Sequence, residues 1–158
     1  MINIKYFFKF AADILLFHGI FMKLTNTSEY ALRILTYMAK DPGQLYTAKS
    51  LIEKLKISDK YLRRLMTTLS KEGFIYSIQG RDGGYSFKKQ PNEIFLADVV
   101  NAVEGMDTYA GCVLGFEECS CENPCVMHST WVKVREEFMS VFTGKTLSDL
   151  DFELAKRY

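Results

Sequence analysis

Four cysteines and one histidine lie close together in the stretch CVLGFEECSCENPCVMH, which runs from residue 112 to residue 128. Thiolate sulphur and imidazole nitrogen are the atoms with which proteins hold zinc ions and iron-sulphur clusters. Cysteines confined to so short a stretch cannot form the spread-out disulfide framework of a secreted fold, so a local metal or redox site is predicted. The five candidate ligands are Cys112, Cys119, Cys121, Cys125 and His128.

The spacing of these residues does not by itself decide between a zinc site, an iron-sulphur cluster and a redox switch of free thiols. An ordinary zinc site uses two close pairs of ligands, whereas Cys112 stands seven residues before the next cysteine, which disfavours zinc without excluding it. A redox switch of free thiols is a third possibility, since Cys119 and Cys121 can pair only with strain. His128 follows Cys125 by about one helical turn, which favours its use as a ligand.

An enzyme that uses Cys125 as nucleophile and His128 as base is the competing reading from a different functional class. No third residue that would orient such a base, and no device for an oxyanion, is evident in the sequence. We therefore expect no enzyme and no small-molecule substrate.

The elements that must position the cysteine stretch follow from hydrophobic periodicity. Three helices are predicted first. The first begins with a capping box of Asn26 and Glu29, Thr47 caps the second, and the third lies between Ser58 and Gly73. The last two form a tight pair, as in a helix-turn-helix.

The pattern changes from helical to alternating at Phe74, which predicts a β-hairpin with a glycine-rich tip. A helix over residues 96–104, a loop over 106–124 and a long final helix from about Ser129 are predicted to follow. The expected fold is mainly α with a small β-hairpin wing: a winged helix-turn-helix and a long C-terminal dimerisation helix.

Charge is distributed unevenly along the chain, although its formal net charge is only +1. Residues 47–90 carry ten Lys and Arg against four Asp and Glu, whereas residues 91–130 carry seven acids and no Lys or Arg. The third predicted helix places its cations opposite the buried face around Leu62, with Arg63 on the flank, which suits the major groove of DNA. Arg81 at the tip of the wing suits the minor groove.

The first 21 residues are apolar and aromatic, but Lys9, Asp13 and His18 interrupt them. A signal peptide and a membrane span are therefore not expected. We interpret residues 1–21 as an extension upstream of a start at Met22. Residues 22–91 are predicted to form the DNA-binding domain, and residues 92–158 the cysteine-rich sensor loop and the dimerisation helix.

The chain resembles the Rrf2 family of winged-helix transcription regulators in MKLTNTSEYALRILTYMA, ISDKYLRRLMTTLSKEGFI, GRDGGYSF, LADVVNAVEG, the cysteine stretch and the closing TLSDL. Family members include iron-sulphur regulators and nitric-oxide-sensitive repressors, although some lack the cysteines. The resemblance implies a cytoplasmic, homodimeric, DNA-binding regulator, most commonly a repressor, that senses redox, nitric oxide or iron-sulphur status. The implied cofactor is an iron-sulphur cluster, of the 2Fe-2S rather than the 4Fe-4S type, with zinc as the alternative.

The family pattern of three cysteines and a histidine corresponds here to Cys112, Cys119, Cys125 and His128. Cys121 is then supernumerary, as a replacement for His128 or a spare thiol. Other relatives take an acidic ligand from the first helix of the partner subunit, and Glu29 occupies that place. We favour a role for Glu29 in capping its helix.

The family's DNA-binding surface implies a set of contact residues. These are Ser58, Lys60, Tyr61, Arg63, Arg64, Thr67, Lys71, Gln79 and Arg81. Iron-sulphur members have a base-reading Glu at the position of Arg63 and an Arg at the position of Gln79, so a different operator sequence is expected. The apolar stripe of the last helix, Trp131, Val134, Phe138, Val141 and Phe142, suits the expected homodimer on duplex DNA.

Overall fold

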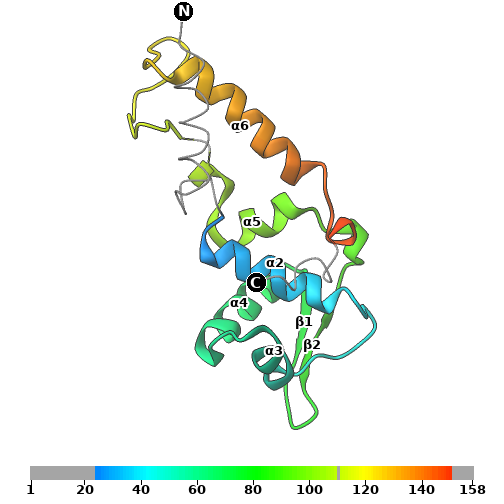
Figure 1. Cartoon of the computed structure of the whole chain (residues 1–158). Helices are drawn as coiled ribbons and strands as arrows, with labels where there is room; N and C mark the ends of the chain where they lie inside the picture. The colour runs from blue at the N-terminus through cyan, green and yellow to red at the C-terminus, as the bar shows by residue number, and fades with distance from the viewer. Residues whose placement is uncertain (1–23, 110, 151–158) are drawn as a thin grey trace, which may run out of the picture.

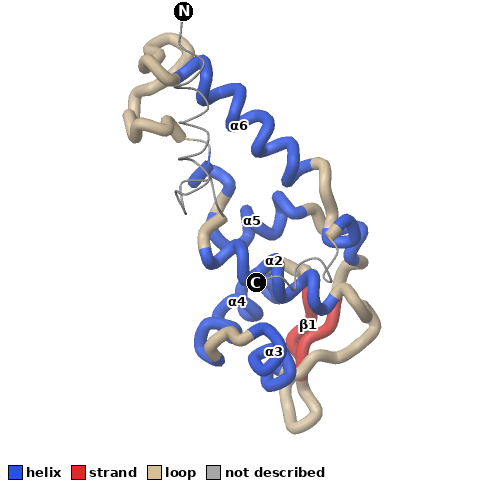
Figure 2. Tube along the Cα trace, viewed as in Figure 1, coloured by secondary structure: helices blue, strands red, loops and turns tan. Residues whose placement is uncertain are grey.

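The computed structural model describes residues 24–109 and 111–150, so the predicted N-terminal extension lies outside the described residues. Within these two ranges, seven regular elements follow one another: α2 (Asn26–Met38), α3 (Ala48–Leu55), α4 (Asp59–Lys71), β1 (Ile75–Ile78), β2 (Gly84–Phe87), α5 (Leu96–Glu104) and α6 (His128–Thr143). Short 3-10 turns occur at η1 (Pro91–Glu93), η2 (Met106–Tyr109) and η3 (Leu147–Asp149). The prediction of a mainly α fold with a small hairpin is confirmed (Figures 1 and 2).

The core lies where α2, α3, α4 and α5 meet, because each helix has one apolar face. The predicted buried stripe of α4 is confirmed, since Leu62, Leu65, Met66 and Leu69 are all buried. α2 packs on α5, so the helix after the wing completes the same core. The opposite face of α4 is left to solvent.

The cap of α2 differs from the prediction by one residue. Thr25, not Asn26, is the N-cap, and its hydroxyl accepts hydrogen bonds from the N–H groups of Thr27 at 3.2 Å and Ser28 at 3.5 Å. The predicted capping box with Glu29 is therefore wrong, and Glu29 instead forms an ion pair with Arg33 at 3.8 Å.

The caps of α3 and α4 lie where the sequence predicts them. The Thr47 hydroxyl accepts a hydrogen bond from the Ser50 N–H at 3.1 Å. Ser58 occupies the N-cap of α4 without a side-chain hydrogen bond to the helix. α4 ends before Gly73, which has a φ of +78° that glycine adopts without strain.

The hairpin has one partner that the sequence pattern did not predict. β1 and β2 pair antiparallel, with Ile75 opposite Phe87 and Ile78 opposite Gly84. On the outer side of β2, Tyr85 exchanges two backbone hydrogen bonds of 2.8 Å with Tyr46. The loop between α2 and α3 thus supports the wing close to its turn.

Gly84 makes this arrangement possible, which gives a first prediction. A Cβ at position 84 would lie 2.6 Å from the carbonyl oxygen of Tyr46. We expect Gly84→Ala to lower the free energy of unfolding by about 1–3 kcal/mol, because the backbone must move to relieve the overlap. Urea unfolding measures the loss. Gly43→Ala is the control, because the nearest atom to its Cβ would be 3.8 Å away, and an equal loss there would contradict the argument.

α6 extends away from the winged-helix body and carries the cysteine loop at its far end, opposite the wing (Figure 1). Within its described length no residue of α6 is buried. Phe138 and Phe142 nevertheless pack against the core, with Phe138 on the ring of Tyr109 at a centroid distance of 5.3 Å. α6 begins at His128, one residue before the predicted start.

The segment after α6 returns to the core. The N–H of Leu147 donates to the carbonyl of Ile94 at 3.0 Å, and the N–H of Leu96 donates to the carbonyl of Lys145 at 2.9 Å. Leu147 is buried. The C-terminal end of α6 is therefore tied to the winged-helix body.

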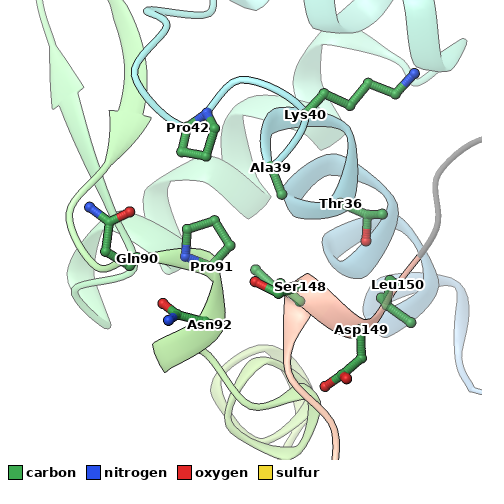
Figure 3. A pocket seen from close by; sticks show the side chains of 11 residues that line it. Thr36, Ala39, Lys40, Pro42, Gln90, Pro91, Asn92, Ser148, Asp149 and Leu150 are labelled. Atoms are coloured by element: carbon green, nitrogen blue, oxygen red, sulfur yellow. The ribbon is translucent and has the colours of Figure 1, made fainter.

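An open groove of about 840 Å³ lies where η1, η3 and the end of α2 meet (Figure 3).

None of the helices in the two described ranges combines the length and the hydropathy that a membrane-spanning helix needs.

Candidate metal centre and nucleic-acid interface

The exposed face of α4 is cationic, as the sequence predicts. Lys60, Arg63, Arg64, Thr67 and Lys71 are all exposed, on the side away from the buried leucines. Arg64 and Lys60 have no side-chain hydrogen bond or ion pair within the described ranges. Such side chains are free to contact phosphates along a DNA backbone.

A groove of about 430 Å³ separates α4 from the wing. Arg63 and Thr67 line it from α4, and Gln79 lines it from the wing. Ser77 and Tyr85 also line this groove, and neither was predicted as a contact residue from the sequence. Alternation along the predicted strands could have placed both residues on one face of the wing, but only the packed hairpin shows that they line the groove beside α4.

The remaining predicted DNA-binding residues differ in their surroundings. Ser58 is exposed at the start of α4, and Arg81 is exposed at the tip of the wing. Tyr61 is half-buried, and its hydroxyl donates to the Thr27 hydroxyl at 2.9 Å. Its ring packs edge-on against Tyr30. Tyr61 therefore connects α4 to α2, in addition to any contact it makes with DNA.

The cysteine loop brings together three of the four thiols. The sulphurs of Cys112, Cys119 and Cys125 all lie within 4.8 Å of one another, and those of Cys112 and Cys125 are 3.7 Å apart. Two thiolates on one tetrahedral ion at about 2.3 Å lie roughly 3.8 Å apart. The spacing of the Cys112 and Cys125 sulphurs would therefore suit two ligands of one metal atom.

His128 lies beside the three sulphurs and is nearest to that of Cys119. Its Nδ1 is 3.2 Å from the Cys119 sulphur, and its Nε2 is 3.7 Å from the Cys121 sulphur. One imidazole thus separates the predicted ligand Cys119 from the supernumerary Cys121. Glu29 is not among the residues that the structure groups at this site.

Local turns and α6 hold the loop in this arrangement. The N–H of Gly115 donates to the Cys112 carbonyl at 2.9 Å, and the N–H of His128 donates to the Cys125 carbonyl at 3.0 Å. The indole Nε1–H of Trp131 donates to the Gly111 carbonyl at 2.7 Å. The sequence pattern predicted Trp131 only as part of the apolar stripe, and this hydrogen bond was not predicted, although the place of Trp131 one turn after His128 was a usable clue.

The entry to the loop is anchored through Tyr109. Its hydroxyl donates to the carboxylate of Glu104, which also accepts a hydrogen bond from the Thr25 hydroxyl. Burial raises the pKa of Tyr109, and the hydrogen bond to Glu104 raises it further. These contacts join the start of α2, the end of α5 and η2 immediately before the cysteines.

The thiols of the triad differ in acidity. Desolvation raises the pKa of Cys112, but backbone hydrogen bonds from Phe116 and Leu114 and contacts with the Cys119 and Cys125 thiols together outweigh it, and the pKa falls to about 7. The backbone N–H of Cys125 lowers the pKa of Cys119, yet desolvation and the neighbouring thiols leave it raised. The Cys112 thiol therefore ionises more readily than the Cys119 thiol, and the ionised thiolate is the form that binds metals.

The donor set of three thiolates and an imidazole fits a zinc ion or an iron-sulphur cluster. A cavity of about 320 Å³ lies between the loop and α6, lined by Cys112, Cys119 and His128 together with Trp131. The site thus has both donors and room for a metal.

Residues 24–151 match the family described as Rrf2, iron-dependent transcriptional regulator. This chain belongs to the Rrf2 family. The resemblance seen in the sequence is confirmed, and the protein is a transcriptional regulator of a family that acts through DNA binding.

Relatives of known name agree with this assignment to Rrf2. The transcriptional regulator NsrR of Geobacillus kaustophilus is 33% identical over 131 residues, which cover 82% of this chain and 89% of NsrR. The structure of CymR, the global cysteine regulator of B. subtilis, is similar with a TM-score of 0.68 at 26% identity, covering 82% of this chain and 95% of CymR. IscR of T. potens has a TM-score of 0.65 at 26% identity, covering 81% of this chain and 85% of IscR. These relatives are transcription regulators rather than enzymes, and the winged-helix fold is confirmed.

The position of Cys121 in this Rrf2 chain gives a second prediction. Cys121 is exposed and lies outside the sulphur triad. We expect Cys121→Ser to keep the metal content within about twofold of the unsubstituted protein, because three thiolates and His128 still complete four ligands. Metal analysis after anaerobic purification measures this. Loss of the metal in Cys121→Ser alone would show that Cys121, not His128, is the fourth ligand.

Proposed function

We propose that this Rrf2 protein is a homodimeric, cytoplasmic repressor whose affinity for DNA depends on an iron-sulphur cluster held by Cys112, Cys119, Cys125 and His128. One observation carries the proposal: three thiols converge at one end of α6, whose other end is tied to the winged-helix body. The family description as iron-dependent and the likeness to NsrR and IscR support it. The structure is also similar to CymR, a global cysteine regulator, so the fold alone does not determine which signal the protein senses. We therefore base the choice of signal on the cysteines of this chain.

The cofactor would supply a group that oxidation or nitric oxide can alter. The chain's own residues do the rest. Cys112 and Cys125 tie the loop to the start of α6, and Trp131 fixes the same junction through Gly111. α6 would transmit the state of the loop to the winged helices of both subunits, whose α4 helices would enter successive major grooves roughly 34 Å apart. All four cysteines are unpaired, which fits a reducing cytoplasm.

The test is to purify the full chain without oxygen, record its visible spectrum and its iron and sulphide content, and measure binding to duplex DNA before and after destroying the cluster. We expect a coloured protein whose affinity for its operator changes at least about tenfold, the range of ordinary allosteric coupling. A colourless protein whose DNA binding ignores iron and thiol state would contradict the sensor.

A second candidate keeps the DNA-binding function and replaces the cluster with a zinc ion or a disulfide. The compact triad supports it, because three sulphurs within 4.8 Å of one another can all reach a single tetrahedral ion. Metal analysis separates the two, since zinc without sulphide would select the second candidate.

A further inference from the structure

Arg63 is held in one orientation on the DNA-facing side of α4. Its Nε–H donates to both carboxylate oxygens of Asp59, at 2.9 and 3.0 Å, one helical turn earlier. Both side chains remain more than half exposed, at 59% for Arg63 and 57% for Asp59. The Nε edge of the guanidinium is therefore occupied, while its two terminal nitrogens have no hydrogen-bond partner among the described residues.

The other cations of this face are not held in this way. Arg64 and Lys60 have no side-chain partner within the described ranges. A flexible cation is suited to phosphates, which form a repeating target and carry no sequence information. A guanidinium already fixed in orientation loses less conformational entropy when it binds a single planar partner.

In a complex with DNA, the surroundings of Arg63 would bring it beside a DNA strand. Arg63 and Thr67 line the groove between α4 and the wing, with Gln79 on the opposite wall. When a recognition helix lies in the major groove and a wing in the neighbouring minor groove, the sugar-phosphate strand between the two grooves passes between them. Arg63 then faces the base pairs that adjoin this strand.

We propose that Arg63 reads a guanine in the major groove and that Asp59 is its positioning residue. This rests on the proposed DNA-binding function. Guanine presents two acceptors, N7 and O6, which match the two terminal nitrogens that Asp59 leaves available. Adenine presents an amino donor in place of O6, so it is discriminated against. Exclusion of water on binding strengthens the contact between Asp59 and Arg63, because the local dielectric constant falls.

The experiment selects bound sequences from a pool of random duplexes with the full-length protein, purified without oxygen, and with three variants of it. Arg63→Lys keeps the charge but loses the planar pair of donors. Asp59→Asn keeps the size of the side chain but removes the carboxylate. Arg33→Lys on α2 is the matched control, because Arg33 also pairs with an acid one helical turn earlier and is not among the predicted DNA contacts. Affinity for the selected site, and for the same site with adenine in place of the guanine, is then measured at several salt concentrations.

The unsubstituted protein is expected to prefer guanine at one position in each half-site by about tenfold to a hundredfold. Arg63→Lys is expected to reduce this preference to about threefold or less, and Asp59→Asn to reduce it by about threefold to tenfold. Neither variant should weaken binding to random duplex or flatten its salt dependence, because the charge of the phosphate contacts is unchanged. A general loss of structure would weaken both kinds of binding.

The outcomes separate this inference from the function on which it rests. If the protein binds no duplex at all, the DNA-binding proposal fails and this inference fails with it. If the protein selects a motif that Arg63→Lys leaves unchanged at every position, base reading by Arg63 alone is overturned. If Arg63→Lys removes the preference and Asp59→Asn does not, the positioning role of Asp59 is overturned. A preference that shifts from guanine to another base in Asp59→Asn would show Asp59 itself to be a reader.

Discussion

Replacing Cys125 by serine is expected to abolish metal binding. Cys125 is central to the triad, since its sulphur lies 3.7 Å from that of Cys112 and within 4.8 Å of that of Cys119. A change in the second shell of a metal site already costs about tenfold to a hundredfold in affinity. Removing a thiolate ligand itself should therefore weaken binding by more than about a hundredfold. Metal and sulphide content and the visible spectrum measure the loss.

The winged-helix half should remain folded in this variant, because Cys125 is not part of the buried core. Far-ultraviolet circular dichroism and binding to random duplex at low salt are the controls. Cys121→Ser is the matched thiol variant and should retain the metal. A Cys125→Ser protein with a full complement of metal would show that the triad is not the ligand set.

Introducing a charge at Val141 is expected to break the proposed homodimer. Val134 and Val141 are 43% and 57% exposed in the single chain, on one face of a helix that has no buried residue within its described length. In the proposed dimer this face meets its copy, where an unpaired carboxylate would cost about 3 kcal/mol or more. Val141→Glu should then raise the dimer dissociation constant by at least about a hundredfold.

Analytical ultracentrifugation over a range of concentrations measures this change. Operator affinity should fall with it, because a monomer contacts only one half-site. Ser140→Glu adds the same charge about 100° around α6 from Val141 and outside the apolar stripe, where Ser140 is exposed, and should leave the dimer intact. If both variants dimerise like the unsubstituted chain, the dimer lies on another surface.

Sequence patterns predicted the elements well where the cause is local. α5 occupies residues 96–104 and ends before Gly105, as the period of its apolar residues and the terminal glycine indicate. The buried stripe and the cationic face of α4 follow from the same 3.6-residue period. The cap at Thr25 was missed because Asn26 is an equally good capping residue by type.

The remaining features depend on contacts between residues far apart in the chain. The pairing of Tyr46 with Tyr85, and the return of Leu147 to the carbonyl of Ile94, join segments that no local periodicity connects. The cysteine loop has no apolar period to order it, so its form comes from turns and from the indole of Trp131. The sequence could name the ligands by type, but not the place of His128 between Cys119 and Cys121.

The attachment of α6 at both ends makes its length a determinant of orientation. The helix has 16 residues, about 24 Å at 1.5 Å per residue, between the cysteine loop and the segment that returns through Leu147. Each residue added to or removed from it would turn the metal-binding end by about 100° relative to the winged helix. The spacing between the cysteines can therefore change without altering how the two ends of α6 face each other, whereas any change in the length of α6 would alter that orientation.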